Sequence, residues 1–220
     1  ALIPKNLTME EAAILPLVGI TAWNALVDRA NVRTGQRVLV HGAAGGVGHI
    51  GLQLAKALAA EVHTTASSDA KIKFGKEIGA DVLINYKKEK VEDYISTHTN
   101  GEGYDVVFDT AGGECLDNSF TAAKIGGSVV SIAARAKHDL SPVHIKSLTL
   151  HVVFMLLPLL RGMGRAHHGN ILRKLGELIE EGLIQPKLHN RKFNFEEVED
   201  AHRCFEEDKI MGKISLVSNW

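Results

Sequence analysis

The sequence is poor in cysteine and has no excess of charge of either sign. Cysteine occurs only twice, at Cys115 and Cys204, and the two share no CxxC spacing. This excludes a disulfide framework and a structural zinc cluster, and it favours a reducing, cytoplasmic compartment. The net charge is -1 with both signs mixed, which gives no electrostatic reason to expect nucleic acid or an anionic membrane as a partner.

Long apolar runs are also missing. The longest, residues 148–160, contains Thr149, His151 and Pro158 and is too short to span a bilayer. The sequence shows no signal-peptide pattern. It opens with Ala-Leu-Ile-Pro rather than Met, so we expect that it begins within a longer protein. Its 220 residues, 45% of them hydrophobic, are enough to bury a sizeable core.

One glycine-rich stretch organises the rest of the chain. The apolar run Val38-Leu39-Val40 leads into His-Gly-Ala-Ala-Gly-Gly-Val-Gly at 41–48, and a helical pattern follows at once. The spacing is Ala43-x-Gly45-x-x-Gly48 rather than a strict three-glycine form. Strand, glycine turn and helix together predict a dinucleotide site, because the glycines admit the pyrophosphate and the N–H groups at the helix N-terminus attract it. The alternative is a glycine turn used only for packing.

Short apolar segments alternate with helical patterns through the middle of the chain. Strands are expected at 37–41, 61–65, 82–84, 104–109 and 127–132, with helices at 46–59, 69–78, 89–97 and 113–123. This alternation predicts βαβ units with right-handed crossovers. We therefore expect an α/β fold: a Rossmann-type doubly wound parallel sheet with helices on both faces.

The two ends of the chain extend this predicted domain. Residues 1–30 are expected to be linker helices, 31–189 the NAD(P)-binding domain, and 190–220 a C-terminal helix and strand. Within 1–30, Thr8 and Glu11 form a capping box that opens a helix, Pro16 ends it, and a second helix runs from 19 to 30. Later segments are expected as a loop at 133–145, a strand at 148–154, a mobile stretch at 161–169, helices at 170–181 and 195–208, and a strand at 213–217.

The end of the second strand indicates which dinucleotide is bound. NAD-binding proteins place an acidic residue there for the ribose 2′-OH, whereas this chain has Ala66 followed by Ser67 and Ser68. Lys71, in the next helix, and Tyr86, after the third strand, are suited to pair with a 2′-phosphate. The pattern favours NADPH over NADH; the alternative is that Lys71 is one surface lysine among several.

The segment VLVHGAAGGVGHIGLQLAKAL at 38–58 resembles the cofactor domain of the medium-chain dehydrogenase/reductase superfamily. It is most similar to the zinc-independent, NADPH-dependent quinone oxidoreductase branch, the zeta-crystallin-like proteins. Further matches lie at 10–26, 80–89, 103–113 and 212–217, so the resemblance covers nearly the whole chain.

The resemblance implies a set of cofactor contacts along the chain. They are Thr21 facing the cofactor; Ala44, Gly45, Gly46, Val47 and Gly48 around the pyrophosphate; Ser67, Lys71 and Tyr86 around the 2′-phosphate; Thr110 and Ala111 near the adenosine ribose; Ile132 and Ala133 beside the nicotinamide; and Lys213 as a basic phosphate contact.

The chain departs from the superfamily in two places. Zinc-dependent members carry a Cys ligand where this chain has Val18, which cannot bind metal, so no metal site is expected. Members also carry a GroES-like substrate domain of about 120 residues ahead of this region. The sequence starts beyond the position of that domain, and residues 190–220 are expected to pack on it.

The expected function is NADPH-dependent hydride transfer to a quinone or to another electrophilic alkene or carbonyl, with the catalytic side chains unknown. The alternatives are a zinc-free alcohol dehydrogenase, an enoyl reductase, and a non-catalytic, crystallin-like NADPH-binding module. His41 and His49, beside the glycine turn, are interpreted as structural residues or phosphate neighbours rather than catalytic acids. A homodimer formed through the edge strand near 148–154 is expected; alternatively, Phe154 to Leu156 line the substrate cleft.

Overall fold

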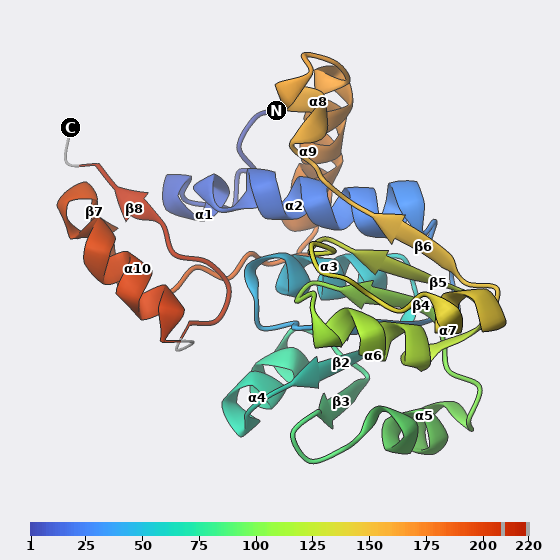
Figure 1. Ribbon diagram of the computed structural model, residues 1–220. Coiled ribbons are helices and arrows are strands. Elements are labelled where there is room, and N and C mark those ends of the chain that lie inside the picture. Colours follow the sequence, from blue (N-terminus) through green and yellow to red (C-terminus); the bar gives the residue numbers. More distant parts are fainter. Residues whose placement is uncertain (208–209, 219–220) are drawn as a thin grey trace.

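The fold is built on a six-stranded parallel sheet, seen in a computed structural model that describes residues 1–207 and 210–218 (Figure 1). The strand order is β3-β2-β1-β4-β5-β6, so the order reverses between β1 and β4. The strands are β1 (Arg37–His41), β2 (Glu61–Ala66), β3 (Val82–Asn85), β4 (Tyr104–Asp109), β5 (Ala123–Ser131) and β6 (Thr149–Val152). The doubly wound α/β fold expected from the alternation is confirmed.

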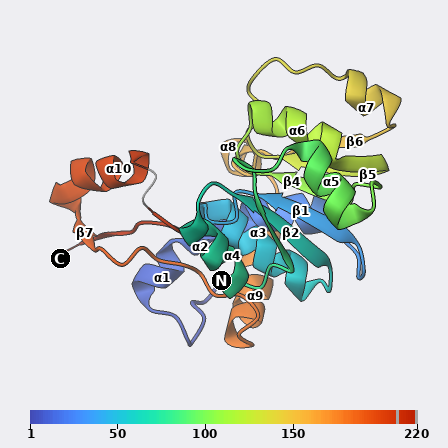
Figure 2. The same ribbon diagram turned by 90° about the horizontal axis from the view of Figure 1, so that it is seen from below.

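Helices cover both faces of the sheet, as Figures 1 and 2 show from two directions. Val38 and Val40 of β1 point into one core and Leu39 into the other, the alternation that a strand imposes. The first core is closed by α2 (Leu15–Trp23), α3 (Gly46–Ala57) and α9 (Arg165–Glu180), and the second by α5 (Val91–Thr99) and α6 (Glu114–Ala122). α4 (Asp69–Glu77) packs against β2 and β3.

The N-terminal helices differ from expectation at Pro16. The capping box is confirmed, since Thr8 and Glu11 bond reciprocally at the start of α1 (Met9–Ala13). Pro16, however, does not end a helix; it lies in the first turn of α2, where a missing N–H costs no hydrogen bond. The helix expected from 19 therefore begins at Leu15, and it continues beyond Trp23 as a π-helical segment, Asn24–Arg29.

The stretch after β5 is more helical than predicted. The expected loop at 133–145 contains the short helix α7 (Ser141–Ile145), again with a proline, Pro142, in the first turn. The segment expected to be mobile, 161–169, is helical from Arg165, where α9 begins after Gly164 in the left-handed region at φ +70. α8 (Leu157–Leu160) precedes it.

A small C-terminal unit stands to one side of the sheet and its helices (Figures 1 and 2). It comprises β7 (Phe193–Asn194), a 3₁₀ turn (Phe195–Glu197), α10 (Val198–Glu206) and β8 (Leu216–Val217). The helix expected over 195–208 is thus split at its start, and residue 208 lies outside the described residues. The strand expected over 213–217 consists of β8 and an isolated bridge from Leu188 to Lys213.

None of the helices that the structure describes is both long enough and apolar enough to cross a bilayer.

Candidate cofactor site

The carboxyl ends of β1 to β5 meet along one edge of the sheet, and most of the predicted contacts lie there. Residues 42–48 follow β1, 67–71 follow β2, Tyr86 follows β3, 110–112 follow β4, and 132–133 follow β5. At the reversal between β1 and β4, the Thr110 hydroxyl donates to the His41 carbonyl at 2.6 Å. This is the position at which open α/β sheets bind their ligands.

The glycine turn depends on small residues for steric reasons. Gly42 has φ +74, and its carbonyl accepts from the Gly45 N–H at 2.9 Å. A Cβ on Gly48 would clash with the Gly42 carbonyl oxygen and lie 2.7 Å from its carbon. The turn and the first turn of α3 therefore touch through backbone alone, which keeps the helix N-terminus open.

The N-terminus of α3 fits a pyrophosphate. Gly45 is the N-cap and offers no side chain, so the first-turn N–H groups of Gly46, Val47 and Gly48 have no side-chain cap. A Cβ on Gly46 would lie 2.5 Å from Cδ of Lys213, which places the lysine stem across this turn. Unsatisfied N–H groups and a neighbouring lysine together provide the positive field that a pyrophosphate needs.

The loops after β4 and β5 are held by one buried carboxylate that sequence reasoning missed. Oδ1 of Asp109 accepts from the N–H groups of Ala111 and Gly112 at 3.0 and 2.9 Å. Its Oδ2 accepts from the Ser131 hydroxyl at 2.6 Å, and that hydroxyl oxygen accepts from the Ala133 N–H at 3.1 Å. The sequence does contain a sign of this role, since Asp109 ends a buried strand and directly precedes Thr-Ala-Gly-Gly.

The end of β2 carries no carboxylate. Ala66 is buried, and the Ser68 hydroxyl caps α4 by accepting from the Lys71 N–H at 3.4 Å. Tyr86 is 54% exposed, and its N–H donates to the Ala66 carbonyl at 3.3 Å. Asp69, in the first turn of α4, is exposed and lies 3.9 Å from the Lys88 ammonium. Ser67, Lys71 and Tyr86 thus lie at the carboxyl ends of the neighbouring strands β2 and β3.

Thr21 has a different environment from the other predicted contacts. It is buried in α2, and its hydroxyl donates to the Leu17 carbonyl at 2.7 Å. The same helix brings Cγ1 of Val18 within 3.3 Å of the Cβ position of Gly46, so α2 packs against the glycine turn. In residues 1–207 and 210–218, no group of three or more His, Cys, Asp or Glu side chains is arranged to hold a metal ion.

His41 lies beneath this edge. It is 4% exposed, and Nδ1 lies 2.9 Å from the Thr65 hydroxyl, while Nε2 has no hydrogen-bond partner within the described part of the chain. Burial lowers its pKa to about 4, with the charge of Asp109 opposing that shift. The neutral form is therefore the one that the fold stabilises, which agrees with its interpretation as a structural residue.

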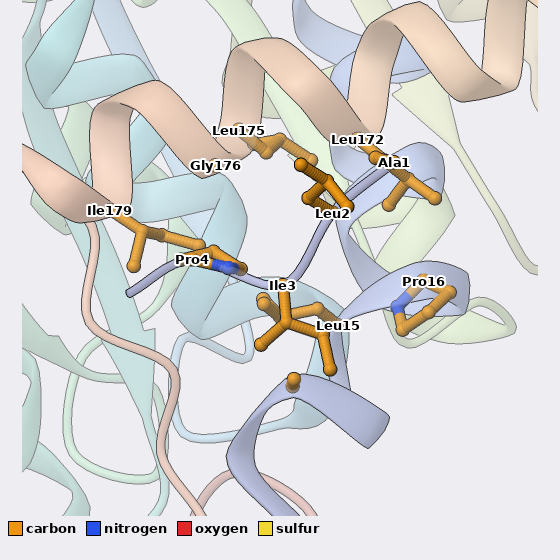
Figure 3. Close-up of a pocket in the computed structure, with 11 residues that line it drawn as sticks. Ala1, Leu2, Ile3, Pro4, Leu15, Pro16, Leu172, Leu175, Gly176 and Ile179 are labelled. Atoms are coloured by element: carbon orange, nitrogen blue, oxygen red, sulfur yellow. The ribbon is translucent and has the colours of Figure 1, made fainter. Parts of the chain in front are cut away.

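A pocket of about 100 Å³ elsewhere is not the cofactor site. It lies among residues 1–4, α2 and α9, and Figure 3 shows its lining side chains, which include Leu15, Leu172 and Ile179. The lining shares no residue with the glycine turn and includes no charged side chain. A dinucleotide needs polar groups to orient it, and this pocket does not supply them.

Comparison with known families agrees with this geometry. The family described as zinc-binding dehydrogenase matches residues 46–161, just over half of the chain. The chain therefore belongs to this family, and it is an NAD(P)-binding domain of the medium-chain dehydrogenase/reductase superfamily. At position 18 this chain has valine, whose side chain offers no ligand atom to a metal.

The individual relatives have diverse names and functions. A highly reducing polyketide synthase from Arthrinium phaeospermum is 31% identical over 97% of this chain, which spans 9% of the synthase. The crystal structure of an alcohol dehydrogenase superfamily protein from Novosphingobium aromaticivorans has a TM-score of 0.92 and 39% identity, over 99% of this chain and 67% of that one. Escherichia coli quinone oxidoreductase complexed with NADPH has a TM-score of 0.89 and 26% identity, over 99% and 68%.

Proposed function

We propose that this chain holds NADPH for a zinc-independent oxidoreductase that transfers hydride to a quinone or another electrophilic alkene or carbonyl. The observation that carries the cofactor proposal is the end of β2, where Ala66 replaces an acid and Ser67, Lys71 and Tyr86 gather. Similarity to a quinone oxidoreductase complexed with NADPH supports both the cofactor and the acceptor. The two cysteines are free thiols, which supports a reducing, cytoplasmic setting.

Each part of the edge has a task in this proposal. When bound, the nicotinamide supplies the hydride. The α3 N-terminus and Lys213 hold the pyrophosphate, and the β2 end holds the 2′-phosphate. Thr110 and Ala111 lie beside the adenosine ribose. Asp109 keeps the loops after β4 and β5 rigid, so that Ile132 and Ala133 orient the nicotinamide and exclude water from it.

Zinc independence is part of the proposal and rests on α2. A zinc-dependent member would need a ligand at position 18, but Val18 is 1% exposed and packs against the glycine turn. The alkyl side chain of Val18 therefore provides no ligand atom for a metal at this position. Hydride transfer without a metal depends on positioning, and the chain provides positioning for the donor.

An enoyl reductase is the second candidate. The specific observation in its favour is the similarity to the crystal structure of CurK enoyl reductase, with a TM-score of 0.84 and 27% identity over 99% of this chain and 65% of that one. The two candidates share the cofactor site and differ only in the acceptor. A binding module without turnover would share the site as well.

The test is NADPH oxidation, followed at 340 nm, by this chain and by the full product of its gene. A quinone, an enoyl thioester and an aldehyde serve as acceptors in parallel. We expect the quinone to be the fastest acceptor of the full product. Faster turnover of the enoyl thioester would replace the first candidate with the second, and NADPH binding without turnover of any acceptor would leave the binding module.

A further inference from the structure

Two segments far apart in sequence form a strap across the glycine turn, consisting of residues 185–189 and 212–213. The Gly212 N–H donates to the Ala44 carbonyl at 2.8 Å, which ties the strap directly to the turn. The Lys213 N–H donates to the Lys187 carbonyl at 2.9 Å, and the Lys213 carbonyl accepts from the His189 N–H at 2.7 Å. The backbone of Lys213 is therefore fixed by its pairing with residues 187–189.

His49, in the first turn of α3, holds the other side of this pairing. It has no exposed surface; Nδ1 lies 2.9 Å from the Gly45 carbonyl, and Nε2 lies 3.0 Å from the Lys187 N–H. A carbonyl only accepts and a backbone N–H only donates, so the proton is on Nδ1 and the lone pair of Nε2 faces Lys187. The neutral ring satisfies both partners, and a second proton would oppose the Lys187 N–H.

We infer that His49 is a positioning residue that, through the backbone of Lys187, sets the Lys213 side chain over the α3 N-terminus to meet a dinucleotide pyrophosphate. This rests on the proposed function, because the pyrophosphate belongs to the proposed cofactor. The chain of contacts is continuous from the His49 ring to Lys187 N–H, from Lys187 carbonyl to Lys213 N–H, and from the Lys213 stem to Gly46.

Steric contacts leave the strap little freedom. A Cβ on Gly212 would clash with the Lys187 carbonyl oxygen and lie 2.7 Å from its Cβ, so the two segments touch closely. Gln53, one turn after His49 on α3, accepts from the Gln185 N–H at 2.8 Å. It secures the start of the strap, whereas His49 secures the residue that pairs with Lys213.

The electrostatics agree with this geometry. Burial lowers the pKa of His49, and the positive charge of Lys213 lowers it further. Within residues 1–207 and 210–218 the Lys213 ammonium has no ion-pair partner, so its charge is available to an anion.

The test compares dissociation constants of NADPH and NADH for the full chain and five variants. His49→Leu removes the acceptor for the Lys187 N–H, and His49→Gln offers an amide oxygen in its place. Lys213→Ala and the double variant His49→Leu/Lys213→Ala complete a mutant cycle. His63→Leu is the matched control, since His63 is equally buried but bonds to Tyr104 of the opposite core and to the exposed Glu61.

We expect His49→Leu to weaken NADPH and NADH equally, by about tenfold, since both carry the pyrophosphate. Lys213→Ala should do the same, the double variant should be no weaker than either, and His49→Gln should recover most of the loss. His63→Leu should lower stability and leave both dissociation constants within about twofold of the parent chain. Only a positioning role through Lys213 predicts this lack of additivity.

Other outcomes overturn the inference. Unchanged binding in His49→Leu would do so, as would losses that multiply to about a hundredfold in the double variant. If the parent chain binds neither nucleotide, the proposed function fails instead. Hydrogen exchange of the Lys213 amide without nucleotide then decides the inference separately: faster exchange in His49→Leu supports it, and equal exchange rejects it.

Discussion

Two segments that follow strands of the sheet, the glycine turn after β1 and the apolar ribbon after β6, differ in how their residues pack. In the turn, residues 42–48, backbone meets backbone, and Gly48 admits no Cβ. In the ribbon, residues 154–163, large apolar side chains face outward: Leu160 is 70% exposed and Met163 67% exposed. The exposed set is Phe154, Leu156, Leu157, Leu159, Leu160 and Met163.

The comparison distinguishes a structure that contacts within one chain determine from a surface that a second molecule would have to cover. Steric contacts within the chain define the turn, so its conformation does not depend on a partner. The large apolar side chains of the ribbon are exposed in the isolated chain, and exposed apolar side chains grouped along one segment are typical of interaction surfaces. Among the described strands, β6 pairs only with β5, so its other edge is unpaired in the isolated chain. We propose that a second copy of the chain covers this edge and ribbon.

The largest expected effect lies in the turn. Gly48→Ala should lower the free energy of unfolding by about 4 kcal/mol or more, because the new methyl group meets the backbone of Gly42, which cannot move aside. Gly169→Ala is the matched control, also within a helix but with open space around the added Cβ. It should stabilise the chain by about 0.5–1 kcal/mol. Urea unfolding measures both, and equal effects would refute the steric account.

Asp109 gives the next largest effect. Asp109→Ala strands the Ser131 hydroxyl and the N–H groups of Ala111 and Gly112, which should cost about 3 kcal/mol. Asp109→Asn keeps an acceptor for those N–H groups and should cost about 1 kcal/mol. Thermal unfolding of both variants measures the difference. Equal losses would show that the hydrogen bonds do not organise the two loops.

The third largest expected effect is a loss of folding stability at acidic pH. The pKa of His41 is lowered to about 4 in the folded chain from the ordinary 6.5, so the unfolded chain takes up the proton first. Stability is therefore retained above pH 6.5 and lost as the pH falls from 6.5 towards 4, with His49 and His63 acting in the same direction. We expect a loss of about 2 kcal/mol between pH 7 and pH 5.

Urea unfolding at a series of pH values checks this prediction. His41→Gln, which cannot titrate, should flatten the profile relative to the parent chain. A flat profile in the parent chain would contradict neutral burial of these histidines.

The smallest effect on stability is expected in the ribbon. Phe154→Ser/Leu160→Ser removes two exposed apolar side chains and should change the free energy of monomer unfolding by no more than about 0.5 kcal/mol. It should nevertheless convert a dimer to a monomer in sedimentation. A parent chain that sediments as a monomer at all concentrations would refute the proposed homodimer.

Much of the fold was predictable because parallel strands buried on both faces are short apolar runs that end at turn residues. The strands at 37–41 and 104–109 were predicted with the bounds observed, and β2 and β3 to within one residue. Two errors fall at Pro16 and Pro142, where proline lies in the first turn of a helix. Sequence alone shows the proline but not which side of it the helix occupies. Two others are the start of β5, at Ala123 rather than 127, and the start of α9, at Arg165 within the stretch expected to be mobile.

The site was predictable where it depends on a local pattern. The positions of Gly45, Gly48 and Ala66 could be predicted from where β1 and β2 end in the sequence. In the structure these residues lie at one edge of the sheet. Asp109 was not recognised, and His49 was interpreted only as a structural residue or phosphate neighbour. The partners of both are distant in sequence: Ser131 for Asp109 and Lys187 for His49. Long-range pairings of this kind require the folded chain.

We propose that the carboxyl edge of the sheet selects NADPH over NADH. Calorimetric titration of the chain with NADPH and with NADH tests it most directly, with Lys71→Ala as the probe and Lys73→Ala, an exposed lysine on the same helix, as the control. The account predicts that NADPH binds at least about tenfold more tightly than NADH, and that Lys71→Ala removes most of this advantage while Lys73→Ala leaves it intact. Equal or tighter binding of NADH, unaffected by Lys71→Ala, would contradict it.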